Sequence, residues 1–441
     1  MKIHQENTFM KQYHKFVTIS LLPASLIFAA CGQEDSTPIE EATVAVATAA
    51  VTDTTGGTET VGIVVDPSTA TEATAAFDGL SNGVSTATDF NTNKDLFEEI
   101  ELTADGVGPV YNAQSCRECH QNPVTGGASQ VTELRAGHFD GTNFINHPGG
   151  SLINDRALNS SIQERVLAGN EVRTFRLSLS LLGDGFVEAI DNATLRAIST
   201  AQPAAQRGQV ITVPILESPG SVRVGRFGWK NQHASLLSFS ADAYVNEMGI
   251  TSSLQPTENT SNGKSVAAFD TVADPEDDGD TDIHAFAAFM RALKVPPRDT
   301  VLAATTSATN GSTLFNSMGC AVCHVRSITT APAGTTINGG TFTVPAALGN
   351  KTIHPFGDYL LHDVGTGDGI VQNGGQTTRN KVRTAPLWGL RSRDRLMHDG
   401  ASVTRSDAIA RHKNEGATAA ANFAALTAAQ KTDVLNFLDS L

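Results

Sequence analysis

The chain has 441 residues, of which 40% are apolar, and a formal net charge of −15 with a pI of about 5.2. This acidic balance disfavours nucleic acid as a partner, because phosphates select basic surfaces. After the N-terminal segment, no apolar run is long enough to cross a bilayer. The length predicts two or three domains with sizeable hydrophobic cores.

The N-terminal segment has the features of an export signal. Three lysines precede the apolar stretch FVTISLLPASLIFAA, residues 16–30, which is too short for a membrane span. Small residues then lead into Cys31, as at a bacterial lipoprotein cleavage site. We therefore expect residues 1–31 to be a lipoprotein-type signal with Cys31 as the lipidated residue. An ordinary secretory signal is the alternative. The protein is then exported to the periplasmic side of a bacterial membrane or to the cell surface, held only by the lipid.

The next segments are predicted in chain order. Residues 32–75 are rich in Ala and Thr and lack a hydrophobic period, so we expect a flexible tether. From residue 76 short helices alternate with Gly- and Asn-rich loops. A helix is predicted from Thr281 to the stop at Pro296, because apolar residues recur there at three- and four-residue spacing.

Further elements follow in the C-terminal part. A short helix is expected over 312–324, and short strands or a loop over 335–348. The C-terminal helix begins with a Thr427–Gln430 capping box. A boundary after Pro296 and Pro297 divides the globular chain into residues 76–305 and 306–441.

Four of the five cysteines lie in two copies of Cys-x-x-Cys-His. This is the attachment sequence for c-type haem. Two thiols on one turn reach the two vinyl groups of the porphyrin, and the next residue offers its imidazole to the iron. The predicted attachment residues are Cys116, Cys119 and His120 for haem 1, and Cys320, Cys323 and His324 for haem 2. A structural zinc site or a redox disulfide is a weaker reading, because the two pairs lie far apart and no thioredoxin-like pattern surrounds them.

A second ligand for haem 2 is predicted near the C-terminus. In RLMHDGASVTRSDAIARH, Thr404 caps a short helix on which His412 shares a face with Ala408 and Ile409. A histidine on such a face is often a satisfied core residue. A haem in the same half of the chain favours ligation of its iron by His412.

Several segments together resemble the di-haem oxidoreductase family, within the bacterial di-haem cytochrome c peroxidase superfamily. They are GPVYNAQSCRECH, GRFGWKNQ with EMGIT downstream, LFNSMGCAVCH, PFGDYLLHDVG, VRTAPLWGL and LMHDGASVTRSDAIARH, spread over residues 77–441. The resemblance implies a mainly α fold of two cytochrome c-like domains, each around one covalent haem, with irregular or short β insertions. It also implies that His412, fourteen positions after His398, is the distal ligand of haem 2. Cytochrome c peroxidases carry Met there, and bis-His ligation lowers the haem potential.

The resemblance makes haem 1 the substrate haem, and its second ligand stays open. His138 and His147 follow His120 in a Gly-rich stretch and either one reaches over the ring, or the site is open or water-bound. Glu247 is a candidate distal acid for moving a proton between peroxide oxygens, with a surface glutamate as the alternative. Trp229 is a candidate carrier of electrons between the haems, with a packing tryptophan as the alternative.

Other residues have weaker assignments. Arg223, Arg226 and Lys230 flank Trp229 and are candidates for pairing with haem propionates. His398 and Asp399 are expected in a second shell around haem 2. Trp388 is read as structural, and Met248 is either a core methionine or a ligand. The acidic run DPEDDGDTD, residues 274–282, is best read as a solvated loop, because its EF-hand pattern fails at Ala285; a Ca²⁺ ion is the alternative.

The sequence therefore predicts a di-haem c-type oxidoreductase. Haem 1 reacts with hydrogen peroxide or a related oxidant, and haem 2 relays electrons from a redox partner protein of the cytochrome or cupredoxin type. Two other classes stay open: a di-haem electron carrier without chemistry of its own, and a di-haem oxygenase acting on an organic substrate.

Overall fold

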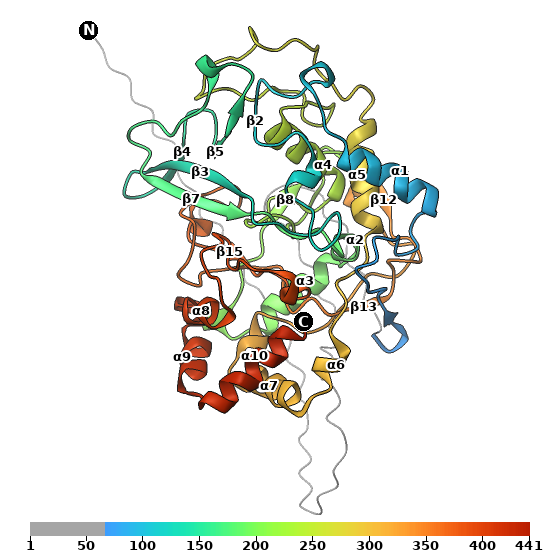
Figure 1. Cartoon of the computed structure of the whole chain (residues 1–441), viewed down its shortest axis with the longest axis vertical. Helices are drawn as coiled ribbons and strands as arrows, with labels where there is room; N and C mark the ends of the chain where they lie inside the picture. Colours follow the sequence, from blue (N-terminus) through green and yellow to red (C-terminus); the bar gives the residue numbers. More distant parts are fainter. Residues whose placement is uncertain (1–66) are drawn as a thin grey trace, which may run out of the picture. The chain divides into compact units, whose positions relative to one another are not determined.

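The computed structural model describes residues 67–441 (Figure 1). The predicted signal segment, Cys31 and residues 32–66 of the predicted tether lie outside the described residues. Residues 67–75, predicted to end the tether, instead belong to the folded chain. Here strand β1 (Thr71–Glu72) pairs in parallel with β13 (Lys351–Ile353), so backbone hydrogen bonds fix a segment whose side chains gave no sign of structure.

The helices are mostly short. They are α1 Ala87–Glu98, α2 Asp184–Glu188, α3 Asn192–Ala201, α4 Leu236–Ala243, α5 Thr281–Ala292, α6 Thr300–Ala303, α7 Thr306–Ser317, α8 Arg405–Ala410, α9 Ala417–Ala425 and α10 Ala428–Asp439. The predicted helix that begins at Thr281 is confirmed as α5. The predicted capping box is present at the start of α10, where the Thr427 hydroxyl accepts from Gln430 N and Gln430 accepts from Thr427 N. Among the described residues, no helix is both long and apolar enough to span a membrane.

The strands contribute more than the predicted short insertions. The further strands are β2 Val110–Tyr111, β3 Thr132–Phe139, β4 Phe144–Asn146, β5 Leu152–Ile153, β6 Arg156–Ala157, β7 Val172–Leu177, β8 Thr212–Pro214, β9 Val222–Val224, β10 Ile328–Thr329, β11 Thr336–Ile337, β12 Phe342–Thr343, β14 Leu361–His362 and β15 Val382–Arg383. The largest sheet of the described residues has the order β4-β3-β5, with β7 also paired to β3, and all its pairs are antiparallel. The mainly α class is therefore not confirmed.

One helical arrangement occurs twice. Helix α1 packs against α5, and helix α7 packs against α10 (Figure 1). In the first pair, Phe97 lies 6.0 Å from Phe286 and 4.9 Å from Phe289 between ring centroids. In the second pair, Phe315 lies 5.2 Å from Phe437. Buried aromatic rings thus join each pair of helices, and each Cys-x-x-Cys-His motif follows the first helix of a pair.

The hydrophobic clusters follow these pairs only in part. One cluster contains only residues from Phe315 onward and is built on α7 and α10. The larger cluster, built on α1, α4 and α5, also takes in later residues such as Ile328 and Trp388. The division into residues 76–305 and 306–441 stays a prediction.

The contact between α7 and α10 depends on Gly311. A Cβ atom added there would lie 2.0 Å from the Asp433 carbonyl oxygen, so the helices can approach this closely only without a side chain. Gly311→Ala is expected to lower the free energy of unfolding by about 1–3 kcal/mol through overpacking. Denaturant titration measures it. Asn310→Ala, on the exposed side of the same turn, is the control and should change stability by less than about 0.5 kcal/mol; equal effects would contradict the close approach.

Candidate functional site

The two Cys-x-x-Cys-His motifs are built alike. Each begins in a 3-10 turn, η3 (Cys116–Glu118) or η7 (Cys320–Val322). The His120 ring is tilted by 55° against Phe97 at 6.4 Å, and the His324 ring is tilted by 55° against Phe315 at 6.2 Å. The backbone N–H of each histidine donates to the carbonyl of the first cysteine of its motif, at 3.1 and 3.0 Å.

Both motif histidines have the same second hydrogen bond. Nδ1 of His120 lies 2.8 Å from the Leu179 carbonyl, and Nδ1 of His324 lies 2.9 Å from the Phe356 carbonyl. A carbonyl can only accept, so Nδ1 carries the proton and Nε2 keeps its lone pair. Burial lowers the pKa of both imidazoles to about 4, so both are neutral at pH 7. A neutral imidazole oriented by a carbonyl is the form that binds a metal.

The four motif thiols are free of disulfides. Burial raises the pKa of Cys119 to about 12 and that of Cys320 to about 11, so these thiols are protonated at pH 7. A redox-active cysteine pair would instead need a stabilised thiolate, so the thiol environment disfavours the redox alternative.

His412 lies opposite His324. It follows α8, whose Thr404 cap is present as predicted, and the two ring centroids are 6.5 Å apart with the planes inclined by 60°. Nδ1 of His412 lies 2.8 Å from the Ala408 carbonyl, so its Nε2 is also free, and burial lowers its pKa. One ion bound at about 2 Å by a nitrogen of each ring fits this spacing, because each centroid lies roughly 1 Å beyond its nitrogen.

A cavity of about 540 Å³ lies between these two histidines and extends toward the first motif. Its volume is within the range of cofactor pockets, about 300–1,000 Å³. Its wall includes Cys320, Cys323, His324, His412, Met318, Leu387, Leu390, Leu396, Ala419, Val434 and Leu438. Thiols, facing imidazoles and an apolar wall are the groups that a haem requires, so the residues present fit this cofactor.

Two arginines also line this cavity, Arg383, which is buried, and Arg393, which is half-buried. Arg383 Nε donates to the Gly228 carbonyl at 2.9 Å, and Arg393 Nη2 donates to the Trp388 carbonyl at 3.0 Å. Burial lowers the pKa of both, that of Arg393 to about 10. Their remaining donors suit the carboxylates of haem propionates. Arg223 and Arg226, predicted for this role, instead donate to carbonyls such as that of Ile190. Lys230 pairs with Asp368 at 3.1 Å.

Trp229 lies on the wall of the same cavity. Its Nε1 donates to the Leu177 carbonyl at 2.7 Å, two residues before the Leu179 carbonyl that binds His120. Its ring lies 6.2 Å from that of His398, another wall residue. His398 Nε2 donates to the Thr366 carbonyl, while its Nδ1 has no partner among the described residues. Trp229 is thus joined by a hydrogen bond and a short stretch of backbone to the first motif.

The surroundings of His120 differ from those of His324. In residues 67–441, no second histidine ring faces His120 in the way that His412 faces His324. His138 is exposed on β3, with Nδ1 2.7 Å from Glu171. His147 is buried, and its Nε2 accepts from Leu167 N at 3.1 Å. His138 is therefore engaged elsewhere, whereas His147 keeps one buried nitrogen, Nδ1, without a partner among the described residues.

Glu247 lies beside the first motif. It is in the π-helical turn η6 (Tyr244–Met248), and its carbonyl accepts from Asn112 N at 2.7 Å and Ala113 N at 3.0 Å. Its carboxyl accepts from Asn112 Nδ2 at 2.9 Å. Burial and the nearby negative charge of Glu133 raise its pKa to about 8. The carboxyl is close enough to Cys119 to contribute to the raised pKa of that thiol.

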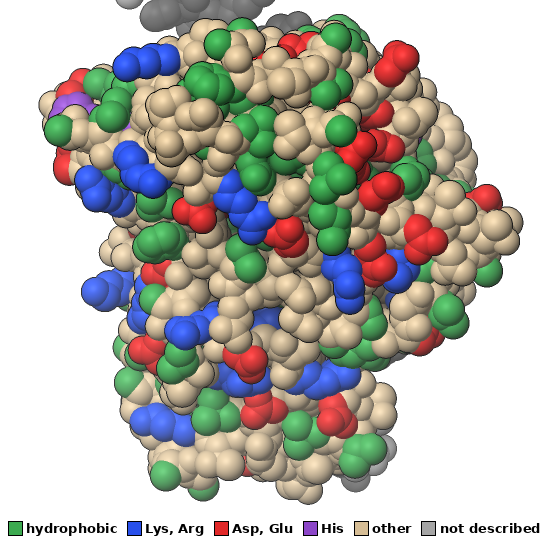
Figure 2. Space-filling model, turned by 45° about the horizontal axis from the view of Figure 1, so that its top comes forward, with side chains coloured by type: hydrophobic (Ala, Val, Ile, Leu, Met, Phe, Trp, Pro, Cys, Tyr) green, Lys and Arg blue, Asp and Glu red, His purple; other side chains and the backbone are tan. Residues whose placement is uncertain are grey.

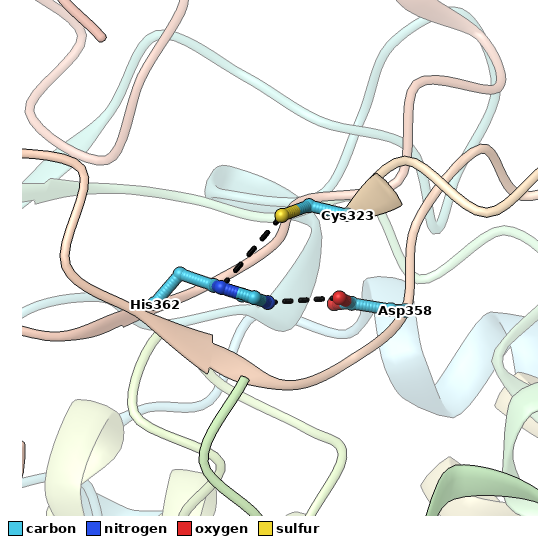
Figure 3. Close-up of side chains that lie close together, drawn as sticks. All are labelled: Cys323, Asp358 and His362. Atoms are coloured by element: carbon cyan, nitrogen blue, oxygen red, sulfur yellow. Dashed lines mark hydrogen bonds and ion pairs between the residues drawn. The ribbon is translucent and has the colours of Figure 1, made fainter. Parts of the chain in front are cut away.

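The sequence missed one charged cluster at the second motif. His362 lies between Asp358, 2.8 Å from Nε2, and Glu415, 2.6 Å from Nδ1, with the Cys323 sulfur 3.7 Å from Nδ1 (Figure 3). Both ring nitrogens face carboxylates, so both donate and the ring is an imidazolium rather than a metal ligand. The only sign of this cluster in the sequence was that Asp358 and His362 both lie in the segment PFGDYLLHDVG.

Two residues of the acidic run 274–282 lie close to a third carboxylate from outside it. Glu258, Asp274 and Glu276 have ligand atoms within 4.8 Å of one another, without Asp278. Calcium there stays a prediction that no observation tests.

A family model described as "Di-haem oxidoreductase, putative peroxidase" matches residues 124–441, which is more than half of the chain. The chain belongs to the di-haem oxidoreductase family. This confirms the resemblance and implies two haems as cofactors. A search of curated proteins finds no significant match.

Three solved structures are similar at low identity. Kuenenia stuttgartiensis hydrazine synthase has 14% identity and a TM-score of 0.39, over 89% of this chain and 99% of its own. A MauG-like protein associated with microbial copper homeostasis has 15% identity and a TM-score of 0.37, over 85% of this chain and 93% of its own. The diheme peroxidase BthA from Burkholderia thailandensis has 14% identity and a TM-score of 0.40, over 84% of this chain and 94% of its own. These similarities add nothing to the family assignment.

The His362 cluster makes a stability prediction. Asp358 and His362 side chains are 0% and 2% exposed, so Asp358→Asn leaves a buried imidazolium with one partner fewer. We expect a loss of about 3–5 kcal/mol in the free energy of unfolding, measured by denaturant titration. Glu72→Gln is the matched control: it breaks a carboxylate–histidine pair with His354 at the surface, where Glu72 is 71% exposed, and should have little effect.

The loss in the free energy of unfolding caused by Asp358→Asn should depend on pH in a definite direction. Burial alone would lower the pKa of His362, but Asp358 and Glu415 raise it well above 6.5, so its contribution is full below pH 6.5 and declines above. His362 in turn lowers the pKa of Asp358, whose contribution is full above pH 3.8 and is lost below. The effect of Asp358→Asn should therefore be largest between these values. A difference that grows as the pH rises above 6.5 would contradict the pairing.

Proposed function

We propose that this protein is an exported di-haem peroxidase that reduces hydrogen peroxide at haem 1 with electrons relayed through haem 2. The observation that carries the proposal is the difference between two otherwise equal motifs. His324 is faced by a second imidazole, that of His412, whereas His120 is faced by none among the described residues. A site with a free position binds an oxidant, and a site with two protein ligands passes electrons.

The first motif also has an acid at hand. Reduction of one hydrogen peroxide to two waters takes up two electrons and two protons. When bound, the haems supply the iron that accepts electrons and activates the oxidant. Glu247, with a pKa raised to about 8 by burial and Glu133, is protonated at pH 7 and can hold and deliver a proton beside this site.

The second motif is suited to relaying electrons. His324 and His412 would hold the iron of haem 2, with covalent attachment through Cys320 and Cys323. Trp229 supports transfer toward haem 1, because it lines the haem 2 cavity and is hydrogen-bonded to the strand residue Leu177, near the carbonyl that orients His120. His398, on the same wall, is proposed as a supporting residue.

Electrons come from a small redox protein of the cytochrome or cupredoxin type. Figure 2 shows Lys and Arg interspersed with Asp and Glu on one face of the molecule, so that face selects no single sign of partner charge. We also propose export and lipid anchoring at Cys31, which rest on the N-terminal sequence alone.

The experiment that tests the function is a reaction of the haem-loaded protein with hydrogen peroxide. The reduced protein should consume one peroxide per two electrons, followed by haem absorbance and residual peroxide. A haem stain after denaturing electrophoresis checks covalent attachment. If neither the oxidised nor the reduced protein reacts with peroxide, the peroxidase proposal is refuted and the protein is a di-haem electron carrier. Reaction with oxygen and an organic substrate instead would indicate an oxygenase.

The ligand assignment has its own test. His412→Ala should convert the haem 2 signal from low spin to high spin in electron paramagnetic resonance, because one imidazole is lost, while both haems stay covalently bound. His138→Ala, which removes an exposed histidine bonded to Glu171, is the control and should leave the low-spin signal unchanged. A low-spin signal that survives intact in His412→Ala would refute this role of His412.

A further inference from the structure

Glu247 does not act on its own in this structure. Its carboxyl lies within hydrogen-bonding reach of the carboxyl of Glu133, which comes from strand β3. Two carboxyl groups can share a hydrogen bond only if one of them carries a proton. The question is which residue holds the proton and what fixes that choice.

The surroundings of Glu133 answer this question. Arg135, two residues on along the same strand, donates from Nε to Oε1 at 2.5 Å and from Nη2 to Oε2 at 3.1 Å. Arg176 on the paired strand β7 places Nη1 3.8 Å from the same carboxylate. Both guanidiniums are nearly buried, with exposed side-chain fractions of 11% and 2%. Two buried positive charges favour the ionised form of Glu133.

Glu247 has the opposite surroundings. Its own neutral partner is the Asn112 amide at 2.9 Å, and the nearest negative charge is Glu133. The other charged groups that act on the pair are Arg135, whose positive charge opposes the effect of Glu133 on Glu247, and Asp242 from α4, which acts on Arg135. Glu118, beside Cys119, pairs with Arg156 at 2.9 Å.

We propose that Glu133 is a positioning residue for Glu247: the two side chains form an acid–carboxylate pair that carries one proton, with Arg135 and Arg176 fixing the negative charge on Glu133. The proton then stays on Glu247, on the side of the pair that belongs to the π-helical turn beside the first motif. The role of the pair in peroxide reduction rests on the proposed function. The pair itself does not, because it exists whether or not peroxide is the substrate.

The titration of the two groups agrees with this geometry. Burial alone would raise the pKa of Glu133, but Arg135 and Arg176 outweigh it and the net pKa is lowered. Burial and Glu133 raise the pKa of Glu247 to about 8. Because the two groups interact, the pair titrates as a unit, with one proton bound over the range between the two values. An acid with this property delivers a proton throughout the neutral range.

A small polar cavity lies next to two residues that adjoin the pair, Arg135 and Asn246. Arg135 lines a small cavity of about 70 Å³, whose wall includes the polar residues Ser151, Asn154 and Asn246, the last being the neighbour of Glu247. A cavity of this size and polarity has room for water. A water molecule in this cavity would lie next to Arg135, which is bonded to Glu133.

The experiment is an infrared pH titration of the haem-loaded protein in its resting state, which needs no turnover. The difference spectrum between the wild type and Glu247→Gln should show one carbonyl band of a protonated carboxylic acid, which disappears near pH 8. The subtraction removes the bands of Asp184, Glu101 and Glu258, whose pKa values burial also raises. Glu133→Gln should move this midpoint down by about one to three pH units, because it removes the negative charge and leaves Arg135 next to Glu247. Arg135→Gln should move it up. The pH at which the peroxide reaction declines should shift in the same directions.

Two control variants distinguish an effect of Glu133 on the titration midpoint of Glu247 from a general loss of protein stability. Glu133→Asp keeps the carboxylate and should restore most of the wild-type midpoint. Glu171→Gln removes an exposed carboxylate bonded to His138 on the same sheet and should not move it. An unchanged midpoint in Glu133→Gln, or in Arg135→Gln if the first variant fails to fold, would overturn the proposal. A shifted band in a protein that ignores peroxide would instead refute the proposed function and leave the pair intact.

Discussion

The arrangement of both motifs depends on one interaction, the hydrogen bond from histidine Nδ1 to a backbone carbonyl. It holds His120 through Leu179 and His324 through Phe356, which belong to segments far from either motif in sequence. The bond fixes the tautomer, directs Nε2 away from the carbonyl and holds each ring against a phenylalanine of the preceding helix. Because each carbonyl lies in an irregular segment, the loops that hold them are as necessary as the helices.

The difference between the two halves arises outside the motifs. Helix α8 brings His412 opposite His324 and leaves a cavity with an apolar wall between them. Beside His120, the corresponding chemistry comes from a π-helical turn and a β-sheet, which contribute the carboxyl groups of Glu247 and Glu133 and the guanidinium of Arg135. One half is therefore equipped with two neutral imidazoles and the other with one imidazole and an acid pair. Equal attachment and unequal surroundings are what a relay and a reaction site require.

Residues that depend on local spacing could be predicted from the sequence. The two motifs were visible directly. The predicted short helix is present as α8, but it ends at Ala410, so His412 lies just beyond its end, where it faces His324. The family match confirms the resemblance on which the other assignments were based. Residues 67–75 and the β3–β7 sheet were missed, because strand pairing is set by partners distant in sequence.

The pair of Glu133 and Glu247 shows why the other site residues could not be predicted from the sequence. Glu133 and Arg135 alternate with apolar neighbours on β3, which marks one polar strand face but names no partner. Only the fold brings that face to Glu247. Similarly, nothing in the sequence shows that Arg223 and Arg226 bind backbone carbonyls while Arg383 and Arg393 line the cavity.

The two haems differ in that one has a free position on its iron and the other does not. Electron paramagnetic resonance of the fully oxidised, haem-loaded protein can show this difference. We expect one high-spin and one low-spin ferric haem in equal amounts, with only the high-spin signal altered by a small exogenous ligand such as fluoride. Two low-spin haems whose signals do not change with the added ligand would refute the difference.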